Sequence, residues 1–229
     1  MGMRDRAIEA TVLRAIDHAV TARGGDALRR AAATTGTTAE RVAQVTQPFG
    51  KELAAVGAAT GGVAALPGIG TVAALATAAA DVGWTTTRAC DLVMAIGAVH
   101  GHTEAPPAVR KAWVVAVLGY GPQAAEVLPR ILAAEEQAAH DRASGRLSGG
   151  SLAALNQGFG RTLVTRWAMR KLATSVGKAL PFGIGAVIGA VANRASVRTI
   201  ARHADMLFRT IGDPAPDAGA PEPVVASVG

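Results

Sequence analysis

The sequence predicts an all-α protein, a single helical bundle in which two apolar helical blocks, each broken by proline and glycine, pack together. Half of the residues are hydrophobic but only 3% are aromatic, so small side chains supply most of the apolar surface. Such side chains suit helices that pack closely. No charged residue occurs between Leu53 and Ala80, or between Ala179 and Ala192. Helical periodicity of apolar residues marks much of the remaining chain.

The chain before the first block is expected to be helical. Residues 4–22 predict an amphipathic helix, because their apolar residues recur on one stripe. Thr37 and Glu40 form a capping-box pattern, in which each side chain accepts a hydrogen bond from the other residue's backbone N–H. This pattern predicts a helix start. Pro48 and Gly50 predict a kink or break in that helix before the apolar block.

Each apolar block contains a turn of similar sequence that feeds a helix rich in small residues. The first block predicts helices over 51–65 and 71–98, and the second predicts one helix that ends near 211. Proline removes a backbone donor and glycine reaches positive φ at little cost, so the chain can turn there. The turn positions are Leu66, Pro67, Gly68 and Gly70 in the first block, and Pro181, Gly183 and Gly185 in the second. Glycine pairs four residues apart, Gly57 with Gly61 and Gly185 with Gly189, predict close helix contacts.

Between and after the blocks, further helices are expected over 107–119, 123–140 and 151–177, with a Gly/Ser-rich loop at 142–151. The loop is not interpreted as a domain boundary, because the later half shows no separate core. Residues 1–211 are therefore predicted to form one domain. Prolines and acidic residues in 212–229 predict a disordered tail.

Three polar residues are predicted to occupy positions in or near the bundle: Asp81, Arg88 and Asn193. Asp81 and Arg88 share a helical face with Trp84 and Asp91. An unpaired carboxylate is costly to bury, so Asp81 is expected to face Arg88, a helix terminus or water. Two interpretations stay open, a charge network at the surface and a functional polar spot inside the bundle.

Positive charge gathers around the second block. The net charge is +6, and no acidic residue lies between Asp141 and Asp205. The pattern fits a solvated helical face or a surface that binds anionic lipid headgroups. Nucleic acid is not predicted, because no binding motif or aromatic platform accompanies the charge. The candidate residues for an anionic surface are Arg166, Arg170, Lys178, Arg194, Arg198 and Arg202.

Catalytic signatures are missing from the sequence. The Gly-Ile-Gly turns lack the lysine of a phosphate-binding loop, and no cofactor is predicted. Cys90, the only cysteine, is interpreted as a core residue. His100 and His102 are weak metal candidates, since alternate residues of an extended strip share one side. A pair of this kind in a glycine-containing loop is more often exposed.

The two turn motifs carry a family likeness. Leu66-Pro-Gly-Ile-Gly, followed by Asp81 and Arg88, and then Leu180-Pro-Phe-Gly-Ile-Gly, extending to Asn193, resemble the EcsC family, named for a protein encoded beside a bacterial ABC transporter. The resemblance covers roughly residues 51–211. It implies a bacterial protein that acts at or near the membrane, and it implies no catalytic residue. The segments 101–107 and 142–151 do not follow the family pattern closely.

The predicted function is that of a non-enzymatic accessory protein on the cytosolic face of the membrane. It would bind the anionic lipid surface or a membrane protein. The N-terminus lacks a signal-peptide pattern, and a lone cysteine suits a reducing compartment. A second hypothesis is a soluble bundle that encloses a lipid-like apolar ligand. A third is a hydrolase or metalloenzyme centred on His100, His102 and Asp81. No oligomeric state is predicted.

Overall fold

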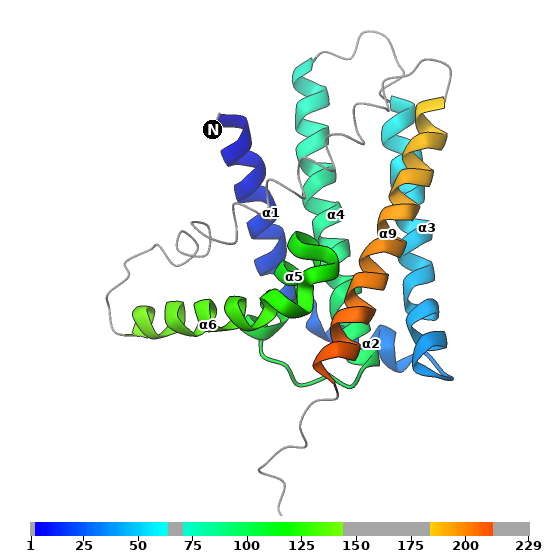
Figure 1. The fold of residues 1–229 in the computed structure, drawn as a ribbon. Coiled ribbons are helices and arrows are strands. Elements are labelled where there is room, and N and C mark those ends of the chain that lie inside the picture. Colours follow the sequence, from blue (N-terminus) through cyan, green and yellow to red (C-terminus); the bar gives the residue numbers. More distant parts are fainter. Residues whose placement is uncertain (1–2, 64–70, 144–183, 213–229) are drawn as a thin grey trace, which may run out of the picture.

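The computed structural model describes residues 3–63, 71–143 and 184–212. Within these ranges the chain forms α-helices, one short 3₁₀ turn and no β-strand, which confirms the all-α prediction (Figure 1). The helices are α1 (Met3–Ala22), α2 (Gly24–Ala32), α3 (Thr38–Val63), α4 (Thr71–Val99), α5 (Pro107–Tyr120), α6 (Ala124–Ala143) and α9 (Ile184–Ile211), and the 3₁₀ turn η1 spans Gly121–Gln123.

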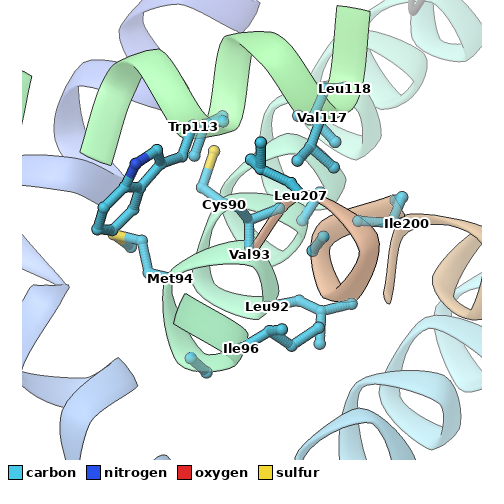
Figure 2. Packing of buried hydrophobic residues seen from close by; sticks show 14 of the residues in the cluster. Cys90, Leu92, Val93, Met94, Ile96, Trp113, Val117, Leu118, Ile200 and Leu207 are labelled. Carbon is cyan, nitrogen blue, oxygen red and sulfur yellow. The ribbon is translucent and has the colours of Figure 1, made fainter. Parts of the chain in front are cut away.

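The central helix is α4, which contacts α1, α2, α3, α5 and α9. Every residue of its last three turns, 88–99, is buried. A helix that is covered on all sides forms the core of a bundle. Its aliphatic side chains meet those of α5 and α9, which cross it from different directions (Figure 2). The labelled partners in Figure 2 are Trp113, Val117 and Leu118 on α5 and Ile200 and Leu207 on α9.

Helices α3 and α9 lie side by side and antiparallel, so that the two apolar blocks pack together as predicted (Figure 1). The Asn193 side-chain amide donates a hydrogen bond to the backbone carbonyl of Leu53 at 2.9 Å, and this buried contact sets the register. The close contact predicted for the two glycine pairs, Gly57 with Gly61 and Gly185 with Gly189, stays a prediction. Small residues at such positions permit close backbone approach.

The predicted break at Pro48 is wrong. Helix α3 continues from Thr38 to Val63 with Pro48 in its interior and exposed. An internal proline costs a helix about 3 kcal/mol or more. The adjacent residues Phe49 and Leu53 are fully buried, and burying two such side chains contributes about 3–6 kcal/mol. Packing on the inner face therefore offsets the proline on the outer face.

Several predicted boundaries are confirmed. Thr37 and Glu40 form the capping box at the start of α3. Pro107 is the first residue of α5, where its missing N–H costs nothing. The first-block helices end at Val63 and restart at Thr71. The turn residues Leu66, Pro67, Gly68, Gly70, Pro181 and Gly183, the helix predicted for 151–177 and the tail 213–229 lie outside the described residues, whereas Gly185 lies within α9.

Candidate functional site

A partly buried ion network joins α3 and α4 to the junction between α1 and α2. The Asp91 carboxylate, on α4, has a side chain only 2% exposed. Arg23, between α1 and α2, donates to both of its oxygens, from Nε at 2.9 and 3.0 Å and from Nη2 at 2.8 Å. Arg88 donates from Nη1 at 2.7 Å and pairs through Nη2 with Glu52 on α3. These ion pairs join α3 and α4 to the junction between α1 and α2, and Arg23 also pairs with Asp26 on α2 at 3.6 Å.

Further contacts hold the two arginines of the network in place. The hydrogen bond to Asp91 raises the pKa of Arg23, which therefore stays protonated. Arg88 lies over the ring of Phe49, with the guanidinium carbon 4.7 Å from the ring centroid, so a cation–π contact also holds it. Each carboxylate is paired with an arginine, Asp91 with Arg23 and Arg88 and Glu52 with Arg88.

The predicted polar positions have different surroundings. Arg88 is buried in the ion network, and Asn193 is buried between α9 and α3. Trp84 was predicted to share a helical face with Asp81, Arg88 and Asp91, and its side chain is 38% exposed. Asp81 belongs to α4, but its side chain lies outside the described residues. Arg88 pairs with Asp91 and Glu52, and Glu52 is a member that the sequence pattern did not single out.

The histidine pair packs against α9 instead of lying exposed in a loop. The His100 side chain is 9% exposed, and its Nε2 lies 2.9 Å from Oδ1 of Asp205, whose other oxygen accepts a hydrogen bond from Arg209. The His102 ring lies 5.3 Å from the Phe208 ring and 5.4 Å from the Trp113 ring. Among the described residues, no group of three or more His, Cys, Asp or Glu side chains could hold a metal ion.

The constellation proposed for a hydrolase is not assembled. Asp81 lies within α4, and His100 follows directly after the end of that helix at Val99. At a rise of 1.5 Å per residue, the part of α4 between Asp81 and its end is about 27 Å long. Cys90 is fully buried, and burial raises the pKa of its thiol well above the ordinary value. The thiolate, which is the nucleophilic form, is therefore suppressed at this position.

The outer side of α9 carries three of the basic residues that the sequence predicted for an anionic surface. We call it the basic face and define it by Val191, Arg194, Arg198, Arg202 and Met206. The arginines are exposed and lie four residues apart, so they share one side of the helix. Exposed apolar side chains stand at both ends, Val191 at 65% and Met206 at 45%. Among the described residues, none of the three arginines pairs with a carboxylate, and α9 has no acidic residue before Asp205.

A groove of about 520 Å³ runs beside the basic face, between α3 and α9. Arg194 and Arg198 belong to both. Among the described residues no acidic side chain lines the groove, and Gln47 provides an amide from the α3 side. Its lining residues are Ala43, Gln44, Thr46, Gln47 and Gly50 on α3 and Arg194, Val197, Arg198 and Ala201 on α9.

Sequence reasoning identified one wall of this groove and missed the other. Arg194, Arg198 and Arg202 were predicted from the lack of acidic residues around them. Gln44 and Gln47 gave no signal, because polar residues on the exposed side of a helix are expected wherever that side faces water. Gly50 was interpreted only as a helix breaker. The other predicted basic residues, Arg166, Arg170 and Lys178, lie outside the described residues.

Two further findings concern membrane spans and similarity to known proteins. None of the helices in the described ranges is long and apolar enough to cross a membrane. Comparison with protein-family models, curated proteins and solved structures finds no match to this chain. The resemblance to the EcsC family therefore stays a prediction from its motifs.

Proposed function

We propose that this chain is a non-enzymatic accessory protein that binds an anionic membrane surface through the basic face of α9. The observation that carries the proposal is the alignment of Arg194, Arg198 and Arg202, free of carboxylate partners, between the exposed side chains of Val191 and Met206. Basic residues near an anionic leaflet each contribute about 1 kcal/mol. Exposed apolar side chains at the ends of the stripe add contact with the interface.

The electrostatic contribution is modest by itself. Three arginines supply about 3 kcal/mol, which corresponds to roughly a 100-fold increase in affinity. Such binding is reversible and salt-sensitive, as expected of a peripheral protein. Arg166, Arg170 and Lys178 belong to the same proposal on sequence alone and would add to it. An acidic membrane protein presents similar charge, and it is the alternative partner for the basic face.

The test is flotation with vesicles of phosphatidylcholine alone and of phosphatidylcholine mixed with phosphatidylserine. Wild-type protein should float with the anionic vesicles only, and salt should release it. Changing Arg194, Arg198 and Arg202 together to Gln should weaken binding by about 100-fold. The matched control changes Arg14, Arg29 and Arg130 to Gln, which removes the same charge from exposed positions on α1, α2 and α6.

The two triple variants separate a located surface from a general effect of net charge. Equal losses in both would mean that the basic face has no special role. Equal binding of wild type to neutral and anionic vesicles would overturn the electrostatic proposal. Binding lost only in the α9 variant supports it.

A further inference from the structure

The groove between α3 and α9 brings polar side chains from two helices to one concave surface. Gln44 is occupied, since its side-chain amide donates to the backbone carbonyl of Thr35 at 2.8 Å and accepts from the Thr35 N–H at 3.3 Å. Within the described part of the chain, the side chains of Gln47, Arg194 and Arg198 make no hydrogen bond or ion pair to another protein group. Donors from both helices therefore border the groove and are not engaged within the described protein.

The spacing of these donors suits one small ligand. Arg194 and Arg198 are one helical turn apart, so their side chains start roughly 5–6 Å from each other on the same side of α9. Gln47 lies on the facing helix α3, one turn before Gly50. Gly50 has no side chain, and a Cβ built on it would have one neighbour within 4 Å, the Cγ atom of Arg194 at 3.9 Å. The volume of the groove falls within the range of about 300–1,000 Å³ typical of small-molecule sites.

The chemistry of the lining selects an anion with several acceptor oxygens. A guanidinium binds phosphate through two parallel N–H donors, and the Gln amide supplies further N–H groups. A phosphate monoester presents three acceptor oxygens and carries about −1.5 to −2 charge near neutral pH. We propose that this groove binds a phosphate monoester group, held by Arg194 and Arg198 from α9 and by the Gln47 amide from α3.

The proposal deepens the proposed function and rests on it, because two of the three arginines of the basic face also line the groove. The same phosphate chemistry comes from two sources, the headgroup of a lipid such as phosphatidic acid or a free phosphate. A bound lipid phosphate would convert general attraction to an anionic surface into preference for one headgroup. Free phosphate would instead compete with the surface for the same arginines.

A matched pair of variants separates the groove from the basic face. Gln47→Glu places a carboxylate in the groove, and Arg202→Gln removes a charge from the part of the basic face that lies outside the groove lining. Each lowers the net charge by one. Both positions are exposed on helices, so the substitutions should leave the fold intact, and circular dichroism checks this. Gln47→Leu, which removes the amide without adding charge, serves as a second groove variant.

The lipid arm compares vesicles containing phosphatidic acid with vesicles containing phosphatidylserine at equal surface potential. Wild type should prefer phosphatidic acid about tenfold or more, as expected for an added charge-assisted hydrogen bond. Gln47→Glu should abolish this preference, and Gln47→Leu should reduce it. Arg202→Gln should weaken binding to both kinds of vesicle about fivefold and keep the preference.

The phosphate arm titrates inorganic phosphate, with chloride at equal ionic strength as the control, and follows the side-chain Nε–H signals of Arg194 and Arg198 by NMR, which wild type and the Gln47 variants share. A saturable shift that is lost in Gln47→Glu supports the groove with a soluble source. Absence of this shift together with equal binding to the two kinds of anionic vesicle overturns the groove and leaves the proposed function standing. A phosphate shift without binding to any anionic vesicle supports the groove and overturns the proposed function.

Discussion

At the residue scale, Asp91 holds the most consequential buried charge in the described structure. It accepts hydrogen bonds from Arg23 and Arg88, and all of its acceptor capacity is directed at cations. Such a network adds little net stability over a well-packed apolar replacement, because desolvation offsets much of the attraction. Removing one partner is different, since the remaining charges stay buried without compensation.

Asp91→Asn should therefore be strongly destabilising. The amide cannot neutralise two arginines, so we expect a loss of about 3–5 kcal/mol in the free energy of unfolding, measured by urea denaturation. Glu52→Gln is the control, because it touches the same arginine but has a side chain 38% exposed. Its cost should stay below about 1 kcal/mol. Similar losses for the two variants would contradict the buried network.

At the element scale, α3 shows how a local signal and tertiary packing share one helix. Its start is local: the Glu40 carboxylate accepts hydrogen bonds from the Thr37 backbone N–H at 2.8 Å and from the Thr37 hydroxyl at 2.9 Å. These bonds lower the pKa of Glu40, the backbone N–H having the larger effect. The middle of α3 depends on tertiary packing, because the burial of Phe49 and Leu53 offsets the cost of Pro48 inside the helix.

Thr37→Ala should loosen the start of α3 and raise the pKa of Glu40. Loss of the cap costs about 1 kcal/mol in the free energy of unfolding. The hydroxyl no longer donates, but the backbone N–H does, so the pKa should return only part of the way to its ordinary value. NMR titration of the Glu40 carboxyl carbon in both proteins measures this, and an unchanged pKa would contradict the capping box.

The sign of the pH dependence follows from the lowered pKa. Glu40 binds protons less readily in the folded chain than in the unfolded one, so its contribution to stability is present above the unfolded pKa. That contribution is lost as the pH falls through the folded pKa. Thr37→Ala should accordingly show a weaker loss of stability on acidification than wild type does.

At the scale of the whole molecule, the bundle depends on how closely α4 and α9 approach, although they are far apart in the sequence. Gly97 of α4 lies directly under the ring of Phe208 of α9, and a Cβ at this position would come within 2.8 Å of the ring. The ring cannot move away easily, because Phe208 is 1% exposed and is packed against Trp113 and both histidines. The absence of a side chain at Gly97 thus sets the distance between the two helices.

Gly97→Ala should destabilise the protein by about 1–2 kcal/mol, since overpacking outweighs the gain in helix propensity. Gly50→Ala is the matched control on α3. Its Cβ would meet Arg194 Cγ at an ordinary 3.9 Å, so we expect stabilisation by about 0.5–1 kcal/mol. Urea denaturation of both variants should give changes of opposite sign. A neutral Gly97→Ala would mean that α9 is free to shift.

The sequence by itself determined the helical class, the boundaries that depend on local chemistry and the basic character of α9. Capping at Thr37 and Glu40, proline at the start of α5 and arginines four residues apart are local patterns, so their consequences can be read without a fold. The passage of α3 through Pro48 could not be predicted in this way, because packing against distant residues outweighed the local penalty.

Only the tertiary structure decided which polar residues meet. Asp91 meets Arg23 and Glu52 joins the network because α3, α4 and the α1–α2 junction converge there. The histidines face α9 because α4 ends beside Asp205. The groove lies between α3 and α9, where packing of the two helices brings Gln47 to face Arg194 and Arg198. Such contacts join residues far apart in the chain, and they form only where the burial of apolar surface brings helices together.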